Sequence, residues 1–236
     1  MNTGFKHSLN IAVAVLLSVV LLQVAKADVF QVTGGISSGN FVDGVNVTDS
    51  QPVLFLGADW SFDNGAFTGA ECYESNSERG ESLSRGCHLF AGYFSQINEN
   101  QAITVELRRK EYLIRTGTFW RYFEGSVDWH VNKRVTLSLG ATDNWLDQGY
   151  STVSFGADYS QPLTSGITAY GLVDVMKFES TANIGYTEHY ELGVKYQKER
   201  WNVGLSAIFS DPLLREQLGF SVSEEQLRLT FSYRLY

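Results

Sequence analysis

Apolar and polar residues alternate one by one along much of this chain. In RVTLSLGAT (residues 134–142), Val135, Leu137 and Leu139 alternate with small or hydroxyl-bearing residues. The stretches STVSFGADY (151–159) and RWNVGLSAIF (200–209) repeat the pattern. Because successive side chains of a strand point to opposite faces, this period of two predicts β-strands with one apolar face and one small, polar face.

Twelve runs of this kind occur, most of them about ten residues long, which is the length of a strand tilted across a bilayer. They cover residues 28–36, 52–62, 65–74, 86–95, 101–111, 117–131, 134–143, 149–160, 166–177, 185–197, 200–210 and 224–236. A soluble sandwich would place large apolar residues inside and charged residues outside. The predicted fold is therefore an all-β, closed antiparallel transmembrane β-barrel of about 12 strands.

The connections between these runs alternate in length. Short connections such as DNG, INEN, NK, PLTSG and KE follow the even-numbered runs, and longer ones, including TDNWLDQG (142–149), follow most odd-numbered runs. Pro162 falls in one of the short connections. Short periplasmic turns and longer external loops are typical of outer-membrane barrels. Since no repeat or linker interrupts the pattern, residues 28–236 are expected to form a single outer-membrane barrel domain.

Aromatic residues gather near the ends of the predicted strands. Two such belts are expected where a barrel crosses the two membrane interfaces. The belt on the short-turn side would contain Trp60, Phe62, Trp129, Tyr159, Tyr196, Trp201 and Tyr233, and the belt on the long-loop side Tyr73, Tyr112, Trp145, Tyr150 and Phe209.

The N-terminal 27 residues have the pattern of a secretory signal peptide. An apolar core, IAVAVLLSVVLL, precedes the small-x-small sequence AKA that ends at Ala27. This core is too short for a membrane helix, which needs about 20 apolar residues. The chain is therefore expected to be exported to the bacterial outer membrane, with lipid as its surroundings. Its formal net charge of −8 argues against a nucleic-acid partner, which requires a basic surface.

If the apolar face contacts lipid, the opposite face lines the lumen and carries charges of both signs. Such charges either form a structural network that fills the lumen or line a narrow pore that orients a small solute. The alternation leaves both interpretations open. The lumen candidates are Asp59, Glu106, Arg108, Lys110, Glu124, Asp128, His130, Asp158, Asp174, His189, Glu191, Lys195, Arg228 and Arg234.

Cys72 and Cys87 lie on the two strands of one predicted hairpin, on either side of its loop. In an exported protein this placement predicts one disulfide across the base of the loop. No CxxC motif or histidine cluster accompanies them, so no metal site and no cofactor are predicted.

Three histidines follow the signal sequence: His88, His130 and His189. His189 shares a strand face with Glu191 near the external side, whereas His130 lies at the periplasmic end. A lipid-modifying hydrolase would need a Ser–His–acid set at the outer rim. A hydrolase using His189 or His88 is therefore the alternative to a non-catalytic channel or structural surface protein, and a soluble periplasmic β-protein is a minor alternative.

The segment GGISSGNFVDGVNVTDSQPVLFLGADWSFDNGAFTGAECY (34–73) resembles the opening of a conserved hypothetical bacterial family of the Gcw_chp type. Asp43 stands where that family usually has arginine, and Phe67 where it has tyrosine. The resemblance implies an exported outer-membrane barrel, and it implies no catalytic residues because the family has no established activity. The positions that fit are Gly44, Val45, Thr48, Asp49, Pro52, Asp59, Gly65, Phe67 and Gly69.

Overall fold

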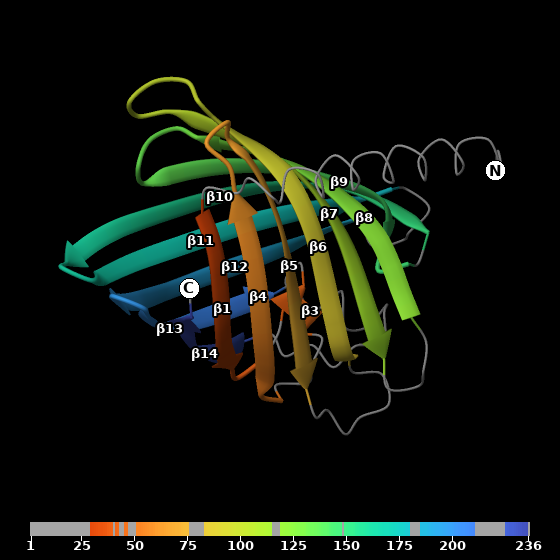
Figure 1. Cartoon of the computed structure of the whole chain (residues 1–236). Coiled ribbons are helices and arrows are strands. Elements are labelled where there is room, and N and C mark those ends of the chain that lie inside the picture. The colour runs from red at the N-terminus through yellow and green to blue at the C-terminus, as the bar shows by residue number, and fades with distance from the viewer. Residues whose placement is uncertain are drawn as a thin grey trace.

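The computed structural model describes residues 29–39, 41–42, 45–46, 51–75, 83–114, 119–147, 149–179, 185–210 and 225–235. The expected signal sequence at residues 1–27 lies outside these residues. Twelve strands form the main sheet (Figure 1), and they are β1 (Val29–Ser37), β4 (Val53–Ser61), β5 (Ala66–Ser75), β6 (Leu83–Gln96), β7 (Ala102–Ile114), β8 (Phe119–His130), β9 (Val135–Trp145), β10 (Tyr150–Thr164), β11 (Ile167–Phe178), β12 (Tyr186–Lys198), β13 (Trp201–Ser210) and β14 (Glu225–Arg234).

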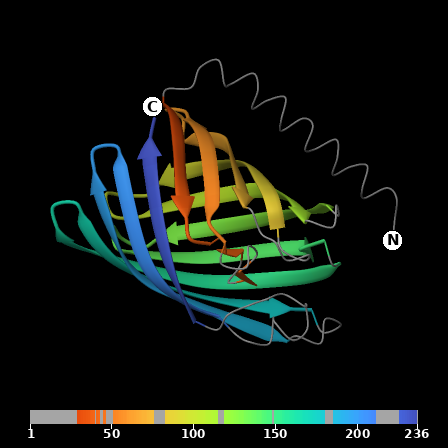
Figure 2. The ribbon, with the colours of Figure 1, turned by 90° about the horizontal axis from the view of Figure 1, so that it is seen from below.

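The sheet closes on itself. Each strand pairs antiparallel with its neighbour in the chain, and β1 pairs both with β4 and with β14, so the order is β1-β14-β13-β12-β11-β10-β9-β8-β7-β6-β5-β4. The ring of strands is visible in Figure 2. Two short strands, β2 (Phe41–Val42) and β3 (Val45–Asn46), form a separate two-stranded sheet. The prediction of a closed antiparallel barrel of about 12 strands is confirmed.

No helix in the described part of the chain is long and apolar enough to cross a membrane.

The barrel has a short-turn end and a long-connection end, and these names are kept below. At the short-turn end, Gly65 and Gly166 both adopt φ of 90°, which glycine tolerates in tight turns. Two expected connections are shorter than the sequence suggested. Strand β9 continues to Trp145, so the first half of TDNWLDQG is strand, and Pro162 lies within β10. Pairing of β10 with β9 ends at Tyr159, so proline interrupts no ladder on that side.

The two faces of the sheet differ as the alternation predicts. Large apolar side chains with one parity are exposed on the outer face, for example Leu54, Leu192 and Leu227. Residues of the other parity point into the barrel and are small or polar, such as Ser206 and Thr142, which are buried. An outer face made of leucine, valine and aromatic residues is the reverse of a soluble barrel.

Several inward-facing glycines are covered by aromatic rings from a neighbouring strand. A Cβ added to Gly86 would lie 2.3 Å from the Tyr73 ring, and one added to Gly92 would lie 2.3 Å from the Phe67 ring. Gly35, Gly69 and Gly193 lie in the same way under Phe55, Phe90 and Tyr170. A glycine in a strand often marks such a close approach. These pairs let large rings lie flat against the inner wall without closing the lumen.

The expected aromatic belt at the long-connection end is wrong for four of its five members. Tyr73, Tyr112 and Trp145 point inward and are buried, and Tyr150, which pairs with Trp145 in the register, also points inward and is partly buried. Tyr73 and Tyr112 have inward parity, and the register shift between Tyr150 and Thr152 turns Trp145 inward as well. They form the aromatic cluster, whose buried members are Val53, Tyr73, Tyr112, Tyr122, Trp145, Leu146, Met176 and Phe178, with Phe55, Trp120 and Tyr150 packed against them. At the short-turn end, Trp129, Tyr159, Tyr196 and Trp201 are exposed outward as expected.

Candidate functional site

Below the aromatic cluster, charged residues from six strands face one another across the lumen. We call this region the charged layer. Strands β7 and β8 supply one side of it, β10 to β12 a second side, and β14 a third. The inward alternation of each strand brings their side chains to a common level, although they come from residues more than 100 positions apart. The layer contains Arg108, Glu124, Asp158, Asp174, His189, Glu191 and Arg228.

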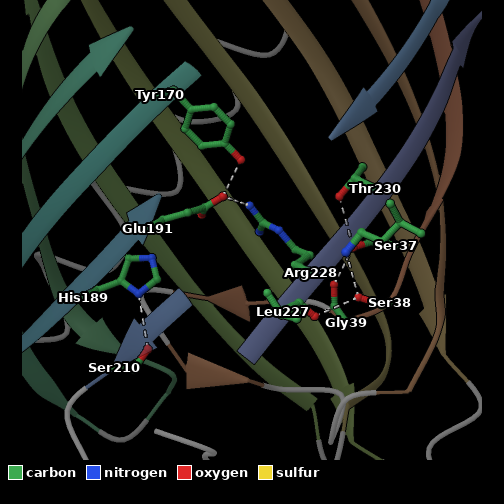
Figure 3. Close-up of polar contacts among 11 residues, drawn as sticks. Ser37, Ser38, Gly39, Tyr170, His189, Glu191, Ser210, Leu227, Arg228 and Thr230 are labelled. Carbon is green, nitrogen blue, oxygen red and sulfur yellow. Dashed lines mark hydrogen bonds and ion pairs between the residues drawn. The ribbon is translucent and has the colours of Figure 1, made fainter. Parts of the chain in front are cut away.

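The best-connected group in this layer is centred on Glu191. Its Oε1 accepts a hydrogen bond from the Tyr170 hydroxyl at 2.7 Å and pairs with Arg228 Nη2 at 2.5 Å (Figure 3). Arg228 lies on β14 and Glu191 on β12, and on the strand between them Ser206 lies opposite Arg228 and Ile208 lies opposite Glu191. The pair therefore bridges two strands that are not neighbours. Glu191 itself is buried, so the positive partner offsets much of the cost of desolvating its charge.

A second charged group lies on β7 and β8. Arg108 pairs with Glu106 on its own strand, with Nη2 and Oε1 at 2.6 Å, and its guanidinium lies 5.8 Å from the centre of the Phe90 ring. Lys110 Nζ lies 2.7 Å from Glu124 Oε2. Lys110 is almost fully buried, whereas Arg108 keeps a third of its side chain exposed to the lumen. Arg108 is thus the cation of this group that a solute could reach.

Between the two charged groups lies a cavity of about 400 Å³. Its wall on β8 to β10 is made of small residues, Ser126, Ser138, Gly140, Ser154 and Gly156. Cavities of a few hundred Å³ are of the size that takes small ligands. The arrangement gives a polar chamber with hydroxyl groups on one wall and charged groups around the rest.

Carboxylates are more numerous than cations in this chamber. Asp158 and Asp174 lie on adjacent strands, offset by two positions in the register. The charges of Asp128 and Glu191 act electrostatically on Asp158. Within the described residues Asp158 has no hydrogen-bonded or ion-paired partner, so it is a carboxylate that faces the cavity without a cation of its own.

His189 contacts Ser210 rather than Glu191. Its Nδ1 lies 3.3 Å from Ser210 Oγ (Figure 3), while Glu191 is bonded to Tyr170 and Arg228. The other histidine of the hydrolase alternative, His88, lies 3.1 Å from the Tyr112 hydroxyl, beside the aromatic cluster. In the described part of the chain, no group of three or more His, Cys, Asp or Glu side chains is placed to hold a metal ion.

The remaining lumen candidates lie outside the chamber. Glu106 and Lys110 border it through their partners Arg108 and Glu124. His130 lies at the short-turn end, where Thr104 and Thr136 contact its two ring nitrogens at 2.9 and 3.0 Å. Asp59, Asp128, Lys195 and Arg234 have inward parity on their strands, and all four lie toward the short-turn end. The structure thus separates half of the candidates from the cavity.

The disulfide between Cys72 and Cys87 is confirmed. The two cysteines are directly opposite each other on β5 and β6. Their parity is that of Ala70 and Leu89, so the disulfide lies on the outer face and takes no part in the chamber.

Some residues of the chamber are absent from the candidates drawn from the sequence. Tyr170 has the same parity as Asp174 on β11, and the small residues of the wall have the same parity as Glu124 or Asp158 on theirs. Parity alone predicts that these side chains point inward, but a list restricted to charged lumen residues does not include them. The sequence alone does not indicate a role for Ser210, because its partner His189 lies on another strand.

No protein-family model matches this chain, so the resemblance of residues 34–73 to the Gcw_chp type rests on those residues alone. No curated protein sequence matches it either.

Solved structures do match along most of the chain. The NanC porin aligns with a TM-score of 0.56 at 12% identity, over 88% of this chain and 100% of that one. The KdgM porin in complex with disordered oligogalacturonate aligns with a TM-score of 0.54 at 12% identity, over the same shares. A further KdgM porin structure has a TM-score of 0.50 at 13% identity. At such identity the likeness establishes the fold, which is that of outer-membrane porins.

Proposed function

We propose that this protein is an outer-membrane β-barrel that acts as a narrow channel for small hydrophilic solutes. The observation that carries the proposal is the cavity of about 400 Å³ in the charged layer, with a wall of serine and glycine and charged groups around it. A purely structural lumen would be expected to fill this level with side chains, as eight-stranded barrels do. Twelve strands enclose more space, and here part of that space stays open.

The outer face of the barrel supports a location in the outer membrane. On β11 the outward residues are apolar or small from Ile167 to Val175, and the next one is Lys177. Eight residue steps along a strand tilted by about 40° span roughly 20 Å across a membrane. This matches the thin apolar band of such barrels, and the exposed tryptophans and tyrosines of the short-turn end would lie at its periplasmic edge. Lipid is then the partner of the outer face.

The charge of the lumen suggests which solutes pass. The structural neighbour KdgM was solved with oligogalacturonate, a chain of sugar acids. In this protein the inward carboxylates outnumber the inward cations among the described residues, so we expect neutral and cationic solutes to be preferred over acidic ones. The carboxylates are Asp59, Glu71, Glu106, Glu124, Asp128, Asp158, Asp174 and Glu191, and the cations are Arg108, Lys110, Lys195, Arg228 and Arg234.

Planar-bilayer recording of the purified protein tests the channel. Wild-type protein should give discrete conductance steps in KCl. Arg228→Ala should raise the unitary conductance, because the arginine side chain crosses β13 toward the cavity. Lys177→Ala is the control, since this lysine faces outward. Absence of steps from folded wild-type protein would show that side chains close the lumen and that the barrel is structural, and steps of equal conductance for Arg228→Ala and wild type would show that solutes do not pass beside Arg228.

One observation supports the alternative function of a lipid-modifying hydrolase, namely the contact between His189 and Ser210. These residues lie at the long-connection end, but they face the lumen and not the lipid. Turnover of lipid A or phospholipid by purified protein, lost on both Ser210→Ala and His189→Ala, would replace the channel proposal. Turnover that survives both changes would remove these residues as its catalytic groups.

A further inference from the structure

The outer face of β7 and β8 carries a group of charged residues next to its apolar residues. On β7 the outward residues Ile103, Val105 and Leu107 are followed by Arg109 and then Glu111. On β8 Arg121 lies directly opposite Glu111 in the register. Four strands away, β11 reaches its first outward charge, Lys177, only after five apolar or small outward positions. The run of apolar outward residues on β7 is therefore shorter than that on β11.

The three residues of this group are two arginines and one glutamate. Arg109 and Arg121 both contact the same oxygen of Glu111, the second of them at 3.6 Å through Nε. Two guanidinium groups thus share one carboxylate. Both remain accessible from outside, with 37% and 55% of their side chains exposed. The Arg109 guanidinium lies 5.9 Å from the centre of the Phe123 ring, which holds it close to the barrel wall.

An apolar groove of about 310 Å³ lies beside this pair of arginines on the same outer face. Leu54, Leu56 and the disulfide of Cys72 and Cys87 line it, and Arg85 and Glu74, paired at 2.8 Å, close it toward the long-connection end. The register places Cys87 next to Glu111. Groove and arginines are therefore neighbours at one level of the outer face.

We propose that Arg109 and Arg121, with the groove beside them, bind a phosphate-bearing lipid of the outer leaflet. The phosphate would take the two guanidinium groups, whose planar donors suit phosphate oxygens, and an acyl chain would lie in the groove. This inference rests on the outer-membrane location proposed above, but it does not require an open lumen.

The occupant is a lipid and not a second copy of the chain for two reasons. The groove is continuous with the exposed apolar side chains Leu89 and Leu107, which face lipid in the proposed orientation. A two-fold interface through this face would also place the arginines of one copy near those of the other, since such interfaces use the same patch on both subunits. Like charges brought together in this way oppose association.

Binding of lipopolysaccharide to the full chain, measured by native mass spectrometry in a neutral detergent, tests the proposal. Wild-type protein should bind intact lipopolysaccharide at least about tenfold more tightly than the same material after enzymatic removal of its phosphates. The double variant Arg109→Gln/Arg121→Gln should lose that preference. Lys177→Gln, which removes an outward cation on β11, is the matched control and should keep it.

A second variant keeps the proposal testable if the double variant does not fold. Glu111→Gln removes the carboxylate that competes for both arginines, and it should tighten binding several-fold. Equal affinity of wild-type protein and the double variant, equal affinity for phosphorylated and dephosphorylated lipid, or weaker binding by Glu111→Gln would each overturn the site. Inorganic phosphate that blocks lipid binding completely would show a free-phosphate site, and dimers cross-linked through Arg121→Cys would show a protein interface. Because binding is measured without conductance, failure of this proposal and failure of the channel remain distinguishable.

Discussion

The aromatic cluster and the charged layer are neighbouring levels of one lumen, yet their side chains are held in different ways. In the cluster, rings pack directly on one another: the Tyr73, Tyr112 and Tyr122 rings are about 6 Å apart in succession, and Phe178 stands edge-on to Trp145 at 5.0 Å. In the charged layer, ion pairs fix the side chains around an open cavity. The comparison indicates that the cluster supplies rigidity and narrows the long-connection end, whereas in the proposed channel the charged layer would determine which solutes pass.

This division also appears in how the two levels use the strands. The cluster draws its residues from β4, β5 and β7 to β11, while β1, β12, β13 and β14 carry Ser37, Thr187, Ser210 and Thr230 near the same end, with Ile208 as an apolar exception. Rings therefore fill one side of the lumen and hydroxyl groups line the other. A water path, where present, would follow the hydroxyl side.

The largest effect is expected from Trp145→Ala. Trp145 is fully buried in the aromatic cluster, so truncation should destabilise the barrel by about 3–5 kcal/mol through lost burial and the cavity left behind. Urea unfolding in detergent micelles measures the change. Trp129→Ala is the control, because this tryptophan is exposed outward at the short-turn end and its loss should cost only about 1 kcal/mol. Equal effects of the two changes would contradict a packed cluster.

A smaller loss of stability is expected where an aromatic ring packs directly on a glycine. Gly86→Ala would place a Cβ 2.3 Å from the Tyr73 ring, forcing a cluster member out of position at a cost of about 1–3 kcal/mol. Gly57→Ala is a close control: Gly57 is also inward, on β4, but its added Cβ would meet nothing nearer than 3.7 Å. That change should be neutral or stabilise by up to about 1 kcal/mol. Unfolding transitions of both variants, measured side by side, test whether the ring contact matters.

The sequence was sufficient for the strands and for the faces they present. Alternation with a period of two survives wherever one face meets an apolar environment, so all twelve strands and the disulfide pairing followed from it. The inward turn of Trp145 did not, because it depends on a register shift between β9 and β10. For Tyr73 and Tyr112, parity predicts an inward side chain, whereas nearness to the strand ends suggests the aromatic belt. The structure agrees with parity.

The composition of the chamber was harder to anticipate. Which inward residues meet across a lumen depends on the stagger between strands that are far apart in the ring, and local alternation carries no information about that stagger. Arg228 and Glu191 could be assigned to one lumen, but their contact across β13 could not. The two residues are offset by two positions across β13, where Ser206 lies opposite Arg228 and Ile208 opposite Glu191.

The smallest effect, and the most direct test of the charged layer, is a change in ion preference. In a KCl gradient, the reversal potential of wild-type channels should indicate that K⁺ passes more readily than Cl⁻, because inward carboxylates are in excess. Asp158→Asn removes a carboxylate that faces the cavity without a paired cation. It should lower the K⁺ to Cl⁻ permeability ratio by about twofold, because one charge in water-filled space changes the energy of a passing ion by about a few tenths of a kcal/mol. Glu188→Gln makes the same change of charge on the outer face, where Glu188 accepts a hydrogen bond from Tyr190, and should leave the ratio unchanged. An anion-preferring wild type would show that Arg108 and Arg228 dominate the chamber despite their carboxylate partners. A shift caused by Glu188→Gln as large as that of Asp158→Asn would mean that the charge of the whole barrel, and not the charged layer, sets the preference.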